Sequence, residues 1–231
     1  MLQNVKPVAS DDHPLSLRAV TMVHLLDGVG LWADIRCERP AEAGPVLFVD
    51  RDGVLIEDRS YVGSAADTAI YPDAPAAIAA ARALGYRVAI VTNQSGIARG
   101  RYDWSGFAAV QAAIDAALAR AGTAVDAVFA CAYHADGRAP YAVADHFWRK
   151  PNPGMILEGL RRLNGNAARS AMVGDKPGDI AAARAAGLGH AVLVEREASG
   201  VASDYAADAV VRSLGEAVKT LVQSGARQGT P

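Results

Sequence analysis

Two aspartates stand two positions apart directly after an apolar run, and carboxyl groups at that spacing could divide the work of a group transfer. Residues 46–49 (VLFV) lead into Asp50, and Asp52 is followed by Gly53. Asp50 could attack a phosphorus atom and form an acyl phosphate that water later cleaves. Asp52 could protonate the departing oxygen and then remove a proton from that water. Ordinary turns also use Asp at this spacing, so the prediction depends on the strand-like run before it.

A hydroxyl and a lysine elsewhere in the chain could hold the group being transferred. Thr92 ends another apolar run and begins a polar turn whose backbone N–H groups can bind phosphate oxygens. The alternative for this turn is a helix-capping residue, which the stretch by itself favours. Lys150 could neutralise the phosphoryl oxygens, and Arg149 could make a bidentate contact with another part of the substrate. The alternative for both cations is a solvated basic loop.

A third carboxylate could complete a metal site. Asp175 follows Gly174 at the end of a further apolar run. Mg²⁺ is usually held by one or two carboxylates, carbonyl oxygens, water and substrate phosphate. Asp50, Asp175 and the backbone carbonyl of Asp52 would form such a partial shell. Asp179 is interpreted instead as a first-turn acid that the helix dipole stabilises.

These side chains can meet only if the strands before them lie in one sheet. Apolar runs alternate with amphipathic stretches from residue 45 onward, which predicts an α/β fold with a Rossmann-like, doubly wound parallel sheet. Because ligands bind at the carboxyl edge of such a sheet, Asp50, Thr92 and Asp175 are expected at one edge. Strands are predicted at 46–49, 86–92, 128–131, 171–173 and 190–194. Helices are predicted from residue 73 to Gly85, over 107–118 before Gly122, after Pro153, ahead of Gly187 and at 214–221.

The chain on either side of this alternating region has a different character. Residues 1–44 are predicted to be a short N-terminal appendage and linker, in which 31–35 (LWADI) alternates like a strand. Residues 45–223 are predicted to form the catalytic domain, and residues 224–231 a frayed tail.

Composition excludes several classes of protein. Of the 231 residues 51% are hydrophobic and 21% are charged, with a formal net charge of −2, so the overall charge gives no attraction to nucleic acid or an anionic membrane. No apolar run is long enough to span a membrane, and the first residues lack a signal peptide. Two distant thiols, Cys37 and Cys131, are typical of a reducing compartment. We therefore expect a cytoplasmic location and a small phosphorylated metabolite as partner.

Together, the four polar stretches resemble the motifs of the haloacid dehalogenase (HAD) superfamily, in the same order, over about residues 45 to 194. Within that superfamily the sequence resembles one branch, the D-glycero-D-manno-heptose 1,7-bisphosphate 7-phosphatases. The histidinol-phosphatases are close relatives of that branch. The stretches that carry this likeness are 48–53 (FVDRDG), 61–62 (YV), 91–100 (VTNQSGIARG), 149–151 (RKP) and 174–176 (GDK).

The resemblance implies a phosphatase that works through a phospho-aspartate and uses Mg²⁺. Asp50 is then the nucleophile, Asp52 the proton donor, and Asp50, Asp52 and Asp175 hold the metal. The residues implied to bind the phosphoryl group are Thr92, Asn93 and Lys150. The residues implied to contact the rest of the substrate are Asp58, Arg59, Ser60, Tyr61, Gln94, Ser95, Arg149 and Lys176.

The sequence departs from this branch in one loop, where relatives bind zinc through Cys-x-His and Cys-x-Cys. The corresponding positions here are Cys131, Tyr133, His146 and Trp148. A tetrahedral structural site needs four Cys or His ligands. Cys131, His134 and His146 could form a remnant, but the loop is expected to be held by packing, without zinc. Because this loop shapes the substrate entrance, the departure bears on specificity for the heptose.

Spacing between the motifs leaves no room for a lid domain, so the chain resembles the capless members of the superfamily. Loops would then exclude water and select the substrate. Heptose 1,7-bisphosphate is the expected substrate, and histidinol phosphate or another small phosphomonoester is the alternative. Two other classes of protein are alternatives. One is a receiver-type signalling module, which keeps its phosphate; Asp52 argues against it, because an acid two residues after the nucleophile promotes hydrolysis. The other is an inactive relative that only binds its ligand.

Overall fold

The computed structural model describes residues 24–197 and 206–228, with side chains described up to residue 223. Within these residues a seven-stranded sheet has the order β1-β4-β3-β2-β5-β6-β7. Every neighbouring pair is parallel except β1 and β4, which are antiparallel. The strands are β1 (Leu31–Ile35), β2 (Val46–Val49), β3 (Arg87–Asn93), β4 (Ala127–Cys131), β5 (Ala171–Gly174), β6 (His190–Val194) and β7 (Ala209–Val211).

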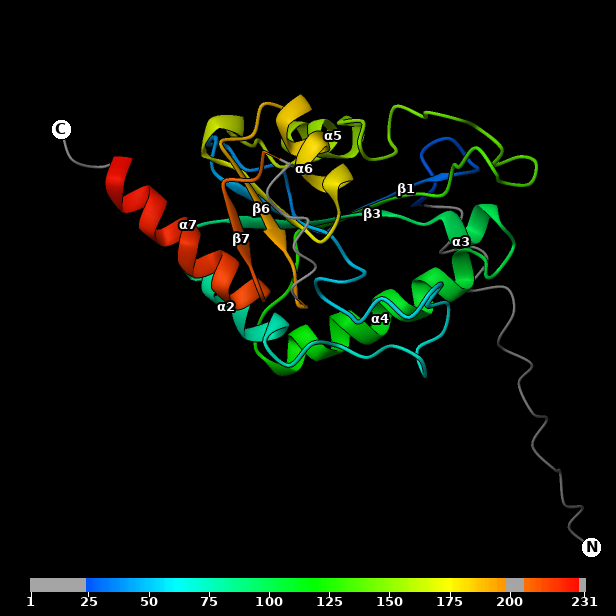
Figure 1. Cartoon of the computed structure of the whole chain (residues 1–231), viewed down its shortest axis with the longest axis horizontal. Helices are drawn as coiled ribbons and strands as arrows, with labels where there is room; N and C mark the ends of the chain where they lie inside the picture. The colour runs from blue at the N-terminus through cyan, green and yellow to red at the C-terminus, as the bar shows by residue number, and fades with distance from the viewer. Residues whose placement is uncertain (1–23, 198–205, 229–231) are drawn as a thin grey trace, which may run out of the picture.

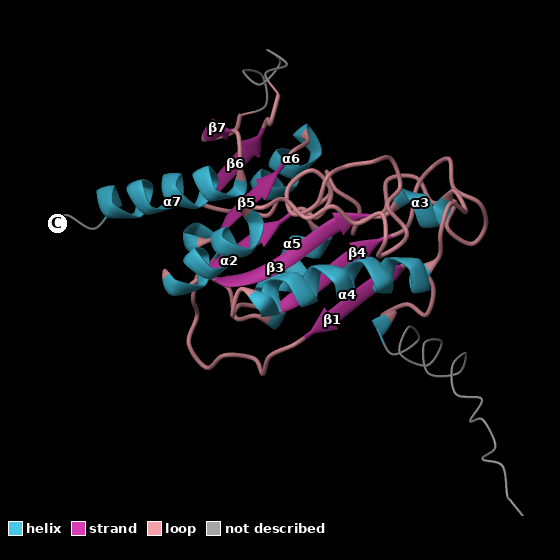
Figure 2. Cartoon of the chain, turned by 90° about the horizontal axis from the view of Figure 1, so that it is seen from below, coloured by secondary structure: helices cyan, strands magenta, loops and turns pink. Residues whose placement is uncertain are grey.

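Helices cover both faces of this sheet (Figures 1 and 2). One face packs against α2, α4 and α7, and the other against α5 and α6. The bounds are α2 (Ala74–Ala83), α3 (Ser95–Ala98), α4 (Trp104–Arg120), α5 (Gly154–Arg162), the 3₁₀ helix η1 (Ala167–Arg169), α6 (Pro177–Ala185) and α7 (Leu214–Gln228). The predicted doubly wound α/β architecture is therefore confirmed.

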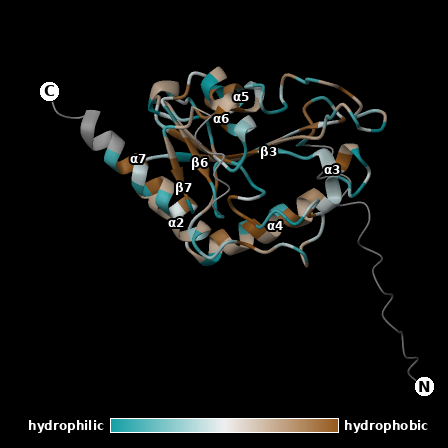
Figure 3. Cartoon of the chain, in the orientation of Figure 1, coloured by the Kyte–Doolittle hydropathy of each residue, from teal (hydrophilic) through white to brown (hydrophobic). Residues whose placement is uncertain are grey.

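The central strands form because their side chains are apolar on both faces. All residues of β2, β4 and β5 are buried, as continuous apolar runs between two helical layers require. Phe48 contributes to the cluster beneath α5 and α6, whereas its neighbours Leu47 and Val49 face the other layer. The helix ribbons alternate between hydrophobic and hydrophilic segments (Figure 3), as expected for helices that turn one face to the core.

Helix α4 shows how local signals set the bounds of an element. Asp103 is its N-cap, and its carboxylate accepts hydrogen bonds from the backbone N–H groups of Ser105 and Gly106, both at 3.0 Å. The predicted stripe of Phe107, Val110, Ile114 and Leu118 is buried in the core. The helix ends before Gly122, whose φ of 69° is a conformation that glycine adopts without strain.

Three features differ from the sequence-based expectations. The sheet gains the antiparallel strand β1 at one edge and β7 at the other. The polar turn after Thr92 contains the four-residue helix α3. Helix α7 continues to Gln228, beyond the 214–221 predicted for it. The alternating segment 31–35 is the strand β1, while the division of the chain at residues 44 and 45 stays a prediction.

The connections at the carboxyl edge of the sheet are loops and short helices. Residues 50–73 link β2 to α2, and residues 132–153 link β4 to α5 without a regular strand or helix of their own. Among the described helices, none has the length and apolar character needed to cross a membrane.

Candidate active site

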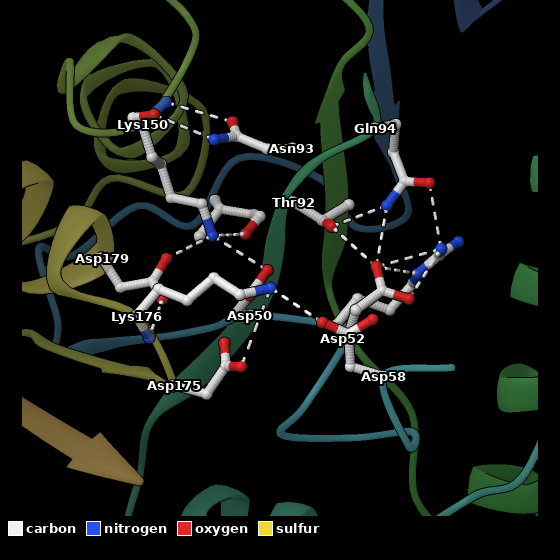
Figure 4. Close-up of polar contacts among 12 residues, drawn as sticks. Asp50, Asp52, Asp58, Thr92, Asn93, Gln94, Lys150, Asp175, Lys176 and Asp179 are labelled. Atoms are coloured by element: carbon white, nitrogen blue, oxygen red, sulfur yellow. Dashed lines mark hydrogen bonds and ion pairs between the residues drawn. The ribbon is translucent and has the colours of Figure 1, made fainter. Parts of the chain in front are cut away.

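The carboxyl ends of three adjacent strands deliver the polar residues to one place. β3, β2 and β5 are neighbours in the sheet, and Thr92, Asp50 and Asp175 stand at or directly after their ends. Lys150 reaches the same place from the loop before α5 (Figure 4). A cavity of about 260 Å³ lies among them, lined by Asp50, Asp52, Thr92, Asn93, Lys150, Lys176, Gly178 and Asp179.

Lys150 is a buried cation between two carboxylates. Its Nζ lies 2.9 Å from Asp50 Oδ1 and 2.5 Å from Asp179 Oδ1, and it donates a hydrogen bond of 2.8 Å to the Val91 carbonyl. The lysine is only 6% exposed. Burial by itself lowers the pKa of Lys150, but the charges of Asp179 and Asp50 outweigh it and raise that pKa above its ordinary value. The ammonium therefore stays charged.

Asp179 belongs to this site, so the interpretation of it as a helix-dipole acid alone is incomplete. It does stand in the first turn of α6, where its Oδ2 accepts a hydrogen bond of 2.9 Å from the Lys176 N–H. Its other oxygen pairs with Lys150, and the residue is 2% exposed. The sequence feature that could have indicated this role is its position, since Asp179 stands in the first turn of a helix that starts at the carboxyl edge of the sheet.

Three carboxylates crowd together without enough cations to balance them. One oxygen each of Asp50, Asp175 and Asp179 lies within 4.8 Å of the others. Burial, followed by the charge of Asp50, raises the pKa of Asp175 to about 8, and burial also raises the pKa of Asp50 against the opposing effect of Lys150. Asp175 Oδ1 is buried and has no hydrogen-bond partner. A hard, oxygen-seeking cation would satisfy it, so this donor set fits Mg²⁺.

Gly53 lets the turn after Asp52 approach Asp175. Its φ is 87°, and a Cβ at this position would lie 2.3 Å from Asp175 Oδ2. A side chain here would therefore meet both backbone strain and a collision with the carboxylate. The turn that carries Asp52 is thus held against the third carboxylate.

Asp52 is held by hydrogen bonds from three side chains. Arg51, which is fully buried, donates from Nε to Oδ2 and from Nη2 to Oδ1, both at 3.1 Å. Gln94 Nε2 donates to Asp52 Oδ2 at 2.9 Å, and the Thr92 hydroxyl lies 3.4 Å from the same oxygen (Figure 4). No role was predicted for Arg51 from the sequence, because nothing in the residues around an arginine between two aspartates indicates that it is buried.

Asn93 contacts the lysine loop with its side-chain amide. Its Nδ2 donates to the Lys150 carbonyl at 2.9 Å, and its Oδ1 accepts from the Lys150 N–H at 3.1 Å. Asn93 therefore connects the end of β3 to the loop that presents Lys150. Asn93 also lines the first cavity, which is compatible with the predicted contact with phosphate. That contact stays a prediction.

A second cavity of about 280 Å³ adjoins the first and shares Asp52, Asn93 and Lys176 with it. Most residues predicted to contact substrate line it: Asp58, Ser60, Tyr61, Gln94, Ser95 and Lys176. Two of these lining residues form an ion pair, with Lys176 Nζ and Asp58 Oδ2 2.9 Å apart (Figure 4).

Arg59 and Arg149 do not line either cavity. Arg59 is paired with Glu57, where Nη2 and Oε2 are 2.7 Å apart. Arg149 is half-buried and donates to the Tyr133 carbonyl at 3.1 Å. Burial lowers the pKa of Arg149, with the nearby charge of Arg99 acting in the same direction. The predicted substrate contacts of both arginines stay predictions.

Aromatic packing fills the loop in which relatives bind zinc. The rings of Tyr133 and His146 stack with centroids 4.4 Å apart, and the Tyr133 hydroxyl donates to Asp27 at 2.6 Å. Trp148 packs edge-on against Phe129. Cys131 is fully buried in β4, and His134 contacts Arg99 through Nε2 at 3.2 Å. The expectation that this loop is held without zinc stays a prediction.

Known proteins share this fold and sequence. A haloacid dehalogenase-like hydrolase family model matches residues 8–187. A D-glycero-beta-D-manno-heptose-1,7-bisphosphate 7-phosphatase of Mesorhizobium japonicum is 47% identical over 155 residues, which cover 67% of this chain and 71% of that protein. A D-glycero-alpha-D-manno-heptose-1,7-bisphosphate 7-phosphatase of Burkholderia mallei is 39% identical over 187 residues, which cover 80% of this chain and 97% of that protein.

Two solved structures agree with these sequence matches. A putative HAD-like phosphatase from Mesorhizobium loti superposes with a TM-score of 0.75 at 41% identity, covering 86% of this chain and 97% of that one. A D,D-heptose 1,7-bisphosphate phosphatase from B. bronchiseptica, complexed with magnesium and phosphate, gives 0.69 at 31% identity and covers 78% of this chain and 99% of that one. With the site at the carboxyl edge of the sheet and the family match over most of its length, this chain belongs to the haloacid dehalogenase-like hydrolases.

Proposed function

We propose that this protein is a Mg²⁺-dependent phosphatase that removes the 7-phosphate of D-glycero-D-manno-heptose 1,7-bisphosphate, in the cytoplasm. The observation that carries the chemistry is the meeting of Asp50, Lys150 and Asp175 at one sheet edge, with Asp52 held beside them. The relatives named above support the substrate. The family match also sets aside the receiver-type interpretation.

In this proposal Asp50 acts as the nucleophile. The substrate phosphate occupies the cavity among Asp50, Thr92 and Lys150, and an Asp50 oxygen forms a bond to phosphorus while the bond to the sugar oxygen breaks. Asp52 gives a proton to that leaving oxygen. Water then attacks the phospho-aspartate, Asp52 takes a proton from the water, and inorganic phosphate leaves with Asp50 restored.

Positive charge around the phosphate lowers the barrier to this transfer. The Lys150 ammonium stays charged in a buried site, where its interaction with developing charge is stronger than in water. Mg²⁺, held by Asp50, Asp175 and the backbone carbonyl of Asp52, would supply further positive charge to the phosphoryl oxygens when bound. Asp179 keeps Lys150 in place from the opposite side.

The second cavity suits the rest of a phosphorylated sugar. Its lining combines the Asp58 carboxylate, the Lys176 ammonium and the polar side chains of Ser60 and Ser95. Such groups offer donors and acceptors to several hydroxyls at once. The two cavities share Asp52 in their linings, and in this proposal the leaving oxygen lies beside that residue.

The proposal is tested with a panel of phosphorylated metabolites ranked by kcat/KM. Heptose 1,7-bisphosphate should rank first and yield one phosphate and heptose 1-phosphate, identified by ³¹P NMR. Histidinol phosphate serves as the competing substrate, and a higher rank for it would overturn the heptose assignment. The Asp50→Asn variant should keep the fold and lose turnover, because the amide cannot form the acyl phosphate. Retained turnover in that variant would refute the nucleophile assignment.

A further inference from the structure

Tyr102 stands beside the site without any role in the chemistry proposed so far. It precedes α4 and lines the second cavity, and its hydroxyl donates to Gln94 Oε1 at 2.6 Å. Two glycines hold its side chain closely on either side. A Cβ on Gly63 would lie 2.6 Å from Tyr102 Cβ, and one on Gly96 would lie 2.3 Å from its Cε1. The tyrosine is therefore wedged between the 50–73 loop and α3.

Gln94 connects this tyrosine to Asp52. Its Oε1 accepts from Tyr102 and from Arg51 Nη2, the latter at 3.0 Å. Its Nε2 donates to Asp52 Oδ2 at 2.9 Å and lies 2.8 Å from the Thr92 hydroxyl (Figure 4). Gln94 is only 1% exposed, so its amide has little access to other partners.

Only one orientation of the Gln94 amide satisfies these contacts. If the amide turned over, its NH₂ would face the Arg51 guanidinium, which has no acceptor, and its oxygen would face the Asp52 carboxylate. The Tyr102 hydroxyl would then have to accept a hydrogen bond in place of the one that it donates. Arg51 also bonds Asp52 directly, and it makes a side-chain hydrogen bond with Tyr102 as well. Burial raises the pKa of Tyr102 to about 12, so the hydroxyl keeps the proton that it donates.

We propose that Tyr102 is a positioning residue for Asp52: it fixes the Gln94 amide, and the amide aims the Asp52 carboxyl at the oxygen that gains or loses the proton. The inference rests on the proposed function, in which Asp52 is the acid and base. It predicts that loss of the Tyr102 hydroxyl weakens proton transfer more than substrate binding.

The test compares Tyr102→Phe on two substrates that differ in their need for a proton. With heptose 1,7-bisphosphate the leaving alkoxide needs one, and kcat/KM should fall about tenfold, the size expected for a misaligned general acid. With p-nitrophenyl phosphate the phenolate leaves without protonation, and kcat/KM should change less than about twofold. Equal losses on both substrates, or no loss on either, would overturn the proposal.

Tyr86→Phe is the matched control, because Tyr86 is half-buried and precedes β3 at the end of the sheet away from the site. It should leave both kcat/KM values unchanged, and a heptose-specific loss in this variant as well would count against a role particular to Tyr102. Thermal unfolding of both variants establishes that they fold.

A double-mutant cycle tests the route through Gln94. Gln94→Met should reproduce the substrate-dependent loss, even if Tyr102→Phe failed to fold, and the double variant should lose little more than either single one. Fully additive losses would overturn the route. A wild-type protein without turnover of either substrate would overturn the proposed function itself, which is a different outcome from an active wild type with an unaffected Tyr102→Phe.

Discussion

At the scale of single residues, the site depends on one cation shared by two buried carboxylates. Lys150 bridges Asp50 on β2's end and Asp179 on α6, so it links two elements as well as two charges. Such a buried group cannot be removed neutrally, because its partners would remain charged and unpaired. In the proposed mechanism the lysine therefore contributes both to the transition state and to the fold around it.

Lys150→Met should lower kcat about a hundredfold or more, on the order of 3 kcal/mol, by analogy with the loss of one preorganised donor to an oxyanion. It should also lower Tm, since Asp50 and Asp179 lose their partner. Lys219→Met is the control, because Lys219 is exposed on α7 and has the same charge. Steady-state kinetics and thermal unfolding check both effects, and an unchanged kcat would remove Lys150 from the site.

We expect Asp175 to make the stabilising effect of Mg²⁺ depend on pH. Its pKa in the metal-free fold is raised from 3.8 to about 8, so the folded state holds a proton that the unfolded state has released. The associated stability is present below about pH 4 and is lost as pH rises to about 8. Mg²⁺ must displace this proton, so its stabilising effect should grow from pH 6 to pH 9.

Thermal unfolding with Mg²⁺ or with EDTA across this pH range measures that growth. Asp175→Asn, which cannot take up or release this proton, should show a smaller shift that depends less on pH, because Asp50, whose pKa is also raised, remains. A Mg²⁺ shift in the wild type that is constant with pH would contradict the prediction.

At the scale of elements, the turn after β2 shows why one position must be glycine. Gly53→Ala should lower stability by about 1–2 kcal/mol from its positive φ. It should also lower kcat/KM at least tenfold, because the new Cβ would displace the Asp175 carboxylate. Gly85→Ala is the matched control: Gly85 has a φ of 86°, and nothing lies within 4 Å of its added Cβ.

Chemical denaturation and kinetics on both glycine variants separate the two effects. Similar losses of stability are expected, and a loss of activity only for Gly53→Ala. Equal activity in the two variants would show that the contact with Asp175 is unimportant.

The central elements could be predicted from sequence because each has a clear pattern within its own residues. Strand β2 is an unbroken apolar run, and α4 carries a stripe with a cap and a glycine stop. Helix α3 has four residues, which is too short for a periodic pattern. The partner of β1 could not be predicted, because its pairing with β4 joins segments far apart in the chain.

The residues of the site likewise fall into those that could be predicted from sequence and those that could not. Asp50, Thr92 and Asp175 could be placed together because strand ends of a parallel sheet meet at one edge. Arg51 could not be recognised as buried, since arginine is ordinarily exposed and its partner Gln94 is remote in sequence. Asp179 looked like an ordinary helix-start acid, because its contact with Lys150 depends on the tertiary fold.

At the scale of the whole molecule, β1 ties the described residues 24–44 to the main core. Trp32 on β1 is 4% exposed and packs against Trp104 and Phe107, with ring centroids 5.5 and 5.2 Å away. The sequence predicted an appendage for this region. If the strand is instead integral to the fold, its loss should destabilise the entire domain.

Trp32→Ala should lower the free energy of unfolding by about 3–5 kcal/mol in one cooperative transition, because it leaves a large cavity among aromatic rings. Urea denaturation followed by circular dichroism measures it. Leu26→Ala is the control, since Leu26 is 49% exposed and should change stability by no more than about 0.5 kcal/mol. An unaltered midpoint for Trp32→Ala would support an independent appendage.

The antiparallel strand has a further consequence for how copies of this protein meet. Without β1, the fully apolar strand β4 would expose unpaired backbone N–H and C=O groups along one edge, where a strand of another molecule could pair with them. With it, the sheet terminates in a five-residue strand carrying Asp34 on one side and in the three-residue strand β7 on the other. Short borders bearing charge are a common protection against strand-to-strand aggregation. Strand β1 thus shields the edge of β4 from intermolecular pairing.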